Sequence, residues 1–233
     1  MSLLTDIKEA LLHLAFPHVC AGCGTDVLDP ESPLCLRCLD ALPVTHFQKF
    51  SNNPVEKLFW GRLPIAAATA QYYFTRHTLM QHLMHHIKYR GHKALGFYLG
   101  QQLGNSVRQT QRFTTVDALV PLPLFAARER ARGYNQAAVL CKGMADILQK
   151  PVLKNSMVRT THTESQTTKS RIERWQNMKD HFEVTDVQQL TGKHLLLVDD
   201  VVTTGATLEA CGRALLGVDG VQLSVATLCV VMD

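Results

Sequence analysis

The segment 194–217 constrains the fold more than any other part of the chain. It reads HLLLVDDVVTTGATLEACGRALLG, which is an apolar run, two acidic residues, a turn of small residues and a stretch with helical periodicity. Short apolar runs bounded by polar turns are typical of buried strands, and a helix that follows at once is typical of a parallel crossover unit. The segment predicts a buried strand over 194–198 and a helix over 207–216.

The rest of the C-terminal two thirds repeats this alternation. Apolar runs at 117–123 (DALVPLP) and 221–231 (VQLSVATLCVV) predict two more buried strands, and 135–149 predicts a helix. Residues 64–74 are expected to form a strand or a hairpin arm, with helices from about 79 to 87 and 93 to 107. Strands alternating with helices of this length predict an α/β fold with a parallel sheet and flanking helices over residues 60–233.

Residues 1–50 differ from the rest of the chain. An amphipathic helix is expected to open the chain, and a segment rich in Cys, Gly, Pro and Asp follows it. Cysteines in the pattern C-x2-C-x11-C-x2-C are close to zinc-ribbon spacing, with a redox pair as the alternative, and thiolates suit a closed tetrahedral Zn²⁺ site. The sequence predicts a small zinc-ribbon-like module held by structural zinc on Cys20, Cys23, Cys35 and Cys38. Residues 52–54 are expected to be a linker.

The location and the partners of the chain are constrained by charge and cysteine usage. An odd number of cysteines with paired spacing favours a reducing compartment. No segment resembles an export signal, and no apolar run approaches the ~20 residues that span a bilayer, so we expect a cytoplasmic protein without membrane insertion. Residues 61–133 hold ten lysines and arginines against Asp117 and Glu129, a net charge of +8. This predicts either a polyanionic partner or a solvated basic face.

The turn after the 194–198 strand suits a phosphorylated sugar. Small residues let backbone N–H groups converge at a helix N-terminus, where the helix dipole favours an anion. Asp199 and Asp200 can accept hydrogen bonds from ribose hydroxyls or hold a hydrated Mg²⁺. The alternative is a helix cap with incidental acids. The predicted phosphate-binding residues are Thr203, Thr204, Gly205, Ala206 and Thr207.

Two basic segments are candidates for the other phosphates of such a ligand. Arg128, Arg130 and Arg132 precede Gly133, and guanidinium groups bind phosphate oxygens bidentately. The alternative is a solvated charged turn. The polar stretch 155–185, which includes Arg171, is expected to be a mobile loop that closes over the site, or else a disordered basic linker.

These motifs resemble known proteins. VDDVVTTGAT looks like the ribose-5-phosphate loop of type I phosphoribosyltransferases, and the segments around 128–132 and 155–185 match their pyrophosphate loop and flexible loop. The resemblance implies binding of 5-phosphoribosyl-1-pyrophosphate with Mg²⁺, catalysis by Asp199, Asp200 and the four arginines named above, and a hood over residues 61–92. Thr203 stands where purine-salvage members carry an aspartate, which argues against hypoxanthine or guanine as acceptor.

The order of all these motifs resembles the ComF family of competence-associated phosphoribosyltransferase-like proteins. That resemblance covers about residues 16–230 and implies a role in natural transformation, with single-stranded DNA or DNA-uptake proteins as partners. The alternative is an active phosphoribosyltransferase that transfers ribose 5-phosphate to a nucleobase or amine, unrelated to DNA uptake. Tyr72, Tyr73 and Tyr89 could stack on a base or pack in the core. The sequence identifies no acceptor and no general base.

Overall fold

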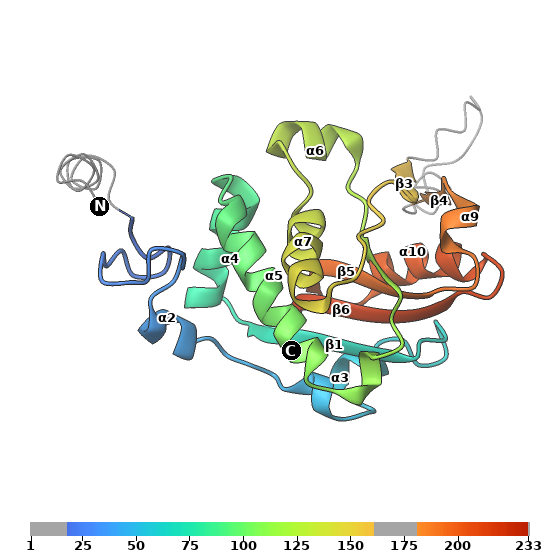
Figure 1. The fold of residues 1–233 in the computed structure, drawn as a ribbon, viewed down its shortest axis with the longest axis horizontal. Helices are drawn as coiled ribbons and strands as arrows, with labels where there is room; N and C mark the ends of the chain where they lie inside the picture. Colours follow the sequence, from blue (N-terminus) through green and yellow to red (C-terminus); the bar gives the residue numbers. More distant parts are fainter. Residues whose placement is uncertain (1–17, 161–180, 233) are drawn as a thin grey trace, which may run out of the picture.

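A parallel four-stranded sheet forms the centre of the protein (Figure 1). A computed structural model describes residues 18–160 and 181–232. The strand order is β1-β6-β5-β2, and each neighbouring pair is parallel. The strands are β1 (Ala67–Phe74), β2 (Ala118–Pro121), β5 (His194–Val202) and β6 (Gln222–Val231). The α/β parallel sheet predicted from the sequence is confirmed.

Helices cover both faces of this sheet, as the alternation of buried side chains along β5 shows. Leu196 and Val198 belong to the apolar cluster with α4 (Leu79–Tyr89), α5 (Lys93–Arg108) and α7 (Gln136–Leu148). Leu195 and Leu197 belong to the opposite cluster, with α3 (Pro54–Lys57) and α10 (Ala206–Leu216). This period of two is what a strand buried on both faces requires. None of the described helices is both long and apolar enough to cross a membrane.

Several short elements complete the described chain. The helices α2 (Leu36–Asp40), α6 (Ala126–Arg132) and α9 (Val187–Leu190) are accompanied by the single turns η1 (Phe47–Lys49) and η2 (Gln111–Phe113). In the region expected to be a loop, β3 (Met157–Thr160) pairs with β4 (His181–Val184) as an antiparallel arm. Residues 161–180, with Arg171, lie outside the described residues, as does the predicted N-terminal helix.

The cysteine module shares the apolar core of the main domain. Cys20, Cys35 and Cys38 belong to the same buried cluster as Met80 and Leu83 of α4. A Cβ at Gly22 would lie 3.0 Å from Leu79 Cδ1, so the module and α4 are in close contact. Figure 1 shows this module at one end of the molecule, beside α4 and α5. The division into two domains, residues 1–50 and residues 60–233, stays a prediction. In the structure, the described part of the cysteine module and the α/β domain share one apolar core.

The expectation of a linker at 52–54 is wrong. Asn53 is 1% exposed, and its side chain accepts hydrogen bonds from the backbone N–H groups of Val55 and Glu56, which caps α3. Its amide also donates to Ala68 O at 2.8 Å, in β1. A buried amide must be satisfied in this way, so the Asn-Pro pair is a helix start fixed to the sheet.

Residues 61–92, expected to form a hood, contain β1 and α4. β1 pairs with β6 at the edge of the sheet and α4 packs over it. The segment therefore contributes both a strand and a covering helix to the main domain.

We expect the fold to lose stability on acidification because of a buried histidine. His194 lies 2.8 Å from Thr115 Oγ1 through Nδ1 and 2.9 Å from Ser224 Oγ through Nε2. Burial lowers the pKa of His194 below its ordinary value of 6.5. The unfolded chain then binds the proton more readily, so stability present above about pH 6.5 is lost as the pH falls toward the folded-state pKa. Denaturant unfolding at about pH 7.5 and about pH 5.5 measures this loss. The free energy of unfolding of His194→Gln should fall less than that of the wild type between these two pH values. An equal fall in both proteins would show that His194 is not the cause.

Candidate functional site

The turn between β5 and α10, predicted to bind phosphate, leads directly into the N-terminus of α10. Gly205 adopts a φ of 75°, and a Cβ there would lie 3.2 Å from the Phe59 ring, so glycine satisfies both the backbone and the packing. Thr203 and Thr204 are exposed beside it, and α10 begins at Ala206. The free N–H groups of the first helical turn and the threonine hydroxyls can therefore donate to a bound anion.

Arg62 tethers this turn to the body of the protein. Its guanidinium donates to Thr204 O at 2.9 Å and to Leu58 O at 2.9 Å, and it forms a salt bridge with Glu209 of α10. From the sequence, Arg62 was only one charge in the basic middle of the chain. Its contacts depend on how residues 58–63 pack on α10, and no local pattern predicts that.

The acidic pair lies in the C-terminal part of β5, next to the turn. Asp200 Oδ2 is 3.1 Å from Nζ of Lys88 on α4, and the two side chains are 14% and 26% exposed. The backbone N–H of Asp200 donates to Asp199 Oδ1 at 2.7 Å. From the sequence, Lys88 was part of the basic segment expected to meet a polyanion, and its contact with Asp200 was missed.

The electrostatics of Asp199 reflect this crowded setting. Burial raises the pKa of Asp199 above its ordinary value, and the neighbouring Asp200 carboxylate raises it further. Lys88 and Arg159 act in the opposite direction. The net shift is upward, so the protonated form of Asp199 is favoured beside the Asp200 carboxylate, and the cations from α4 and β3 offset this only in part.

A protein-held Mg²⁺ does not fit this acidic pair well. Mg²⁺ demands octahedral oxygen coordination and retains several waters. One oxygen of Asp200 is already engaged by the ammonium of Lys88. The donor set thus favours hydrogen bonding to a ligand over holding a metal, and we assign no Mg²⁺ to these two residues.

The arginine segment forms the short helix α6, which stands off the sheet in Figure 1. Arg132 donates to Gln136 Oε1 at 2.5 Å and lies 5.7 Å from the Tyr89 ring centroid. Arg128 lies 6.0 Å from the Phe125 ring centroid. No hydrogen bond or ion pair among the described residues joins an α6 arginine to the acidic pair. The pyrophosphate role of Arg128, Arg130 and Arg132 stays a prediction.

Arg159, in the basic stretch 155–185 that was expected to close over the site, acts on the acidic pair. On β3, its guanidinium is 4.2 Å from the Phe125 ring centroid and 5.4 Å from that of Phe182 on β4. Stacking between two rings holds a guanidinium in place. Its positive charge helps to hold down the pKa of Asp199, so the antiparallel arm brings a cation to the site.

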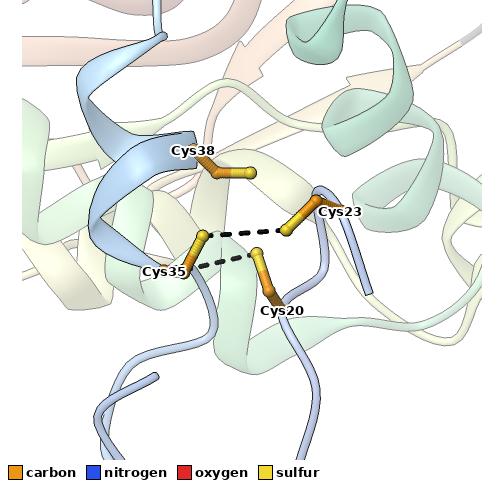
Figure 2. Close-up of side chains that lie close together, drawn as sticks. All are labelled: Cys20, Cys23, Cys35 and Cys38. Atoms are coloured by element: carbon orange, nitrogen blue, oxygen red, sulfur yellow. Dashed lines mark hydrogen bonds between the residues drawn. The ribbon is translucent and has the colours of Figure 1, made fainter. Parts of the chain in front are cut away.

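The four cysteines of the N-terminal module converge as a metal site would require (Figure 2). Their sulfur atoms all lie within 4.8 Å of one another, and Cys23 Sγ is 3.7 Å from Cys35 Sγ. Cys35 N donates to Cys20 Sγ at 3.3 Å. A Cβ at Gly22 would lie 2.8 Å from Cys38 Sγ, which explains the glycine in this knuckle. In the part of the chain that the structure describes, this is the only such cluster.

The ionisation of these thiols fits a bound cation. Burial raises the pKa of Cys38 well above its usual value, and the neighbouring sulfurs raise it further. Burial also opposes ionisation of Cys20, but backbone N–H groups of Cys35, Cys23 and Gly22 hold its pKa below the usual value. A cation at the centre would stabilise all four thiolates, and a closed set of four sulfurs fits Zn²⁺.

Comparison with known proteins finds relatives that cover most of the chain. A phosphoribosyl transferase domain matches residues 135–233, which include β5, the turn and α10. Competence protein F of Haemophilus influenzae is 29% identical over 218 residues, which cover 91% of this chain and 91% of that protein. DNA utilization protein YhgH of Escherichia coli K12 is 29% identical over 222 residues, 93% of this chain and 92% of that protein.

Two further similarities are more limited in extent. Competence protein ComFC of Bacillus subtilis is 37% identical over 98 residues, 42% of this chain and 38% of that protein. Glutamine phosphoribosylpyrophosphate amidotransferase of B. subtilis superposes with a TM-score of 0.37 at 16% identity, over 56% of this chain and 25% of that one, which is too loose to add to the assignment. The full-length relatives, the domain match and the four-cysteine cluster confirm the resemblance to the ComF family of competence proteins that was found in the sequence.

Proposed function

We propose that the chain binds 5-phosphoribosyl-1-pyrophosphate, with the 5-phosphate in the turn 203–207. The observation that supports this most is the geometry of Gly205. It is the N-cap of α10, it packs against the Phe59 ring, and it makes no side-chain hydrogen bond to the first N–H groups of the helix. Asp199 and Asp200 lie in β5 just before this turn, and in the proposal their carboxyl groups bind the ribose hydroxyls. In this proposal Mg²⁺ arrives bound to the pyrophosphate of the ligand, because Asp200 is paired with Lys88.

Gly205→Ala is expected to weaken binding of phosphoribosyl pyrophosphate about tenfold or more. The added Cβ meets the Phe59 ring, and the positive φ disfavours alanine, so the N–H groups shift from their positions. Calorimetry of both proteins measures the affinity. Gly192→Ala is the matched control, because Gly192 has a φ of +70° and its Cβ would meet nothing within 4 Å. Equal affinity for Gly205→Ala and wild type would leave the turn as a helix cap only.

The family relationship supports a role in DNA uptake, with single-stranded DNA as a partner. The basic surface expected for this lies along α4, α5 and α6. It includes Arg90, which follows α4, Lys93 at the start of α5, and Arg130 on α6. Of the three tyrosines considered for stacking, Tyr72 packs in the core and Tyr73 contacts Phe47. Tyr89 is 69% exposed on α4 and remains available for a base.

The alternative is an active transferase, which the domain match alone would favour. Continuous detection of pyrophosphate release with each acceptor in turn distinguishes the two. We expect no transfer to hypoxanthine, guanine or orotate, because a threonine stands at position 203 and threonine is a poor general base. Rapid turnover with one of these acceptors would establish the enzyme.

A further inference from the structure

The contact between Lys88 and Asp200 joins the acidic pair to a different layer of the protein. Asp200 is on β5, and Lys88 is on the helix that covers the sheet at the opposite end from the antiparallel arm (Figure 1). With side chains 26% and 14% exposed, the pair is partly shielded from water, so its electrostatic interaction is stronger than that of a surface ion pair.

The position of Lys88 is fixed by its neighbours on α4. Ile87 is buried, and its carbonyl accepts a hydrogen bond from the hydroxyl of Tyr134, which precedes α7. Met80 and Leu83, toward the start of the helix, pack in the cluster that contains the cysteine module. The backbone that carries the ammonium is therefore held at both ends, and the lysine is not a mobile surface side chain.

A divalent cation and the ammonium of Lys88 would compete for the same carboxylate. Mg²⁺ dehydrates reluctantly and usually binds through one or two carboxylates, so to bind through Asp200 Oδ2 it would have to displace the ammonium of Lys88. The ammonium occupies Asp200 Oδ2, and the guanidinium of Arg159 adds a second positive charge near Asp199. A positive group thus already lies near each carboxyl group, and the direct ion pair is the one between Lys88 and Asp200.

We propose that Lys88 is the resident cation of the acidic pair and positions Asp200, in place of a divalent metal held by the protein. In the sugar-phosphate site, this makes Lys88 a positioning residue that holds the Asp200 carboxylate in a fixed orientation. The part that concerns ligands rests on the proposed function. The competition between lysine and metal does not, and it can be tested without any sugar.

Manganese titration of zinc-loaded protein, followed by electron paramagnetic resonance, tests the proposal directly. The wild type is expected to bind no Mn²⁺ at this pair at about 1 mM metal, whereas Lys88→Met should bind one equivalent in that range. Lys88→Met combined with Asp200→Asn should lose the site again. Lys88→Arg keeps the charge and should behave as the wild type.

Lys93→Met is the matched control for net charge. It removes the same charge, but among the described residues its Nζ lies 5.2 Å from the Tyr134 ring centroid and makes no ion pair with Asp200. It should bind no Mn²⁺. A wild-type protein that binds one Mn²⁺ and loses it in Asp200→Asn would overturn the proposal. So would a folded Lys88→Met protein, checked by circular dichroism, that binds none.

Ribose 5-phosphate, which lacks pyrophosphate, provides the second measurement. The affinity of the wild type for this sugar should be the same within about twofold in metal-free buffer and in buffer with Mg²⁺. In metal-free buffer, Lys88→Met should bind it about tenfold more weakly than the wild type, and Mg²⁺ should restore part of this affinity. Wild-type binding that already needs Mg²⁺ would contradict the role of Lys88. Absence of sugar binding in every variant would instead refute the proposed function, and the manganese titration would still decide the role of Lys88.

Discussion

Replacing Cys35 with serine is expected to remove the metal and to lower the thermal midpoint of the whole protein by about 10 °C. The effect should be large because a structural zinc site contributes folding free energy outright. It should also extend beyond the module. Cys35 and Cys38 share a buried cluster with Leu83 of α4 and Leu95 of α5, so a loosened module exposes the core that these helices complete.

Metal analysis, calorimetric melting and hydrogen exchange together measure this result. Wild-type protein purified without added metal should carry one zinc per chain, and Cys35→Ser should carry none and exchange faster along α4. Cys141→Ala is the control, because Cys141 is a buried thiol of α7 outside the four-cysteine cluster and its loss should leave the zinc in place. A folded wild type without metal would contradict the zinc site. A metal-free Cys35→Ser variant with the thermal midpoint of the wild type would contradict the dependence of the core on the cysteine module.

Binding of single-stranded DNA is expected to weaken steeply with salt and to depend on Tyr89. If three phosphates are contacted, raising the salt from about 50 mM to about 200 mM should weaken binding roughly 20-fold, because each contact releases counterions. Tyr89→Ala should weaken it about tenfold further, which is the usual effect of losing one base-stacking aromatic. Tyr89 is suited to this because it is exposed and has Arg132 5.7 Å from its ring centroid.

Fluorescence anisotropy with a labelled oligonucleotide measures both effects. Trp60→Ala is the matched control, since Trp60 is also an exposed aromatic at 59% but follows α3, whose residues pack on the other face of the sheet. It should leave the affinity unchanged. A flat salt response, or equal losses in the two variants, would remove the DNA-binding surface assigned to α4, α5 and α6.

The sequence predicted the features that depend on local patterns. Strand, acids, turn and helix at 194–217 follow each other without a gap, so periodicity and turn chemistry locate β5 and α10. The paired spacing of the cysteines likewise predicted their convergence, which the sulfur positions confirm. Both features can be predicted because their sequence patterns are local: one lies in a single continuous segment, and the other is a regular spacing of cysteines.

The features that were missed are tertiary contacts. No local sequence pattern around Lys88 predicts its ion pair with Asp200. Asn53 lies in a sequence typical of a loop, and only the structure shows that its amide donates to Ala68 O in β1. Charge patterning assigned the arginines of α6 to a phosphate site, but it could not show that Arg159, held between two aromatic rings, would bring its charge to Asp199.

A crystal structure with phosphoribosyl pyrophosphate would show whether the sugar phosphate binds at the end of β5. We expect the 5-phosphate within hydrogen-bond distance of the backbone N–H groups of residues 204–207, with the ribose hydroxyls on the Asp199–Asp200 side and Lys88 still paired with Asp200. Phosphate density at another surface, or a divalent metal bound by Asp200 with Lys88 displaced, would contradict this expectation.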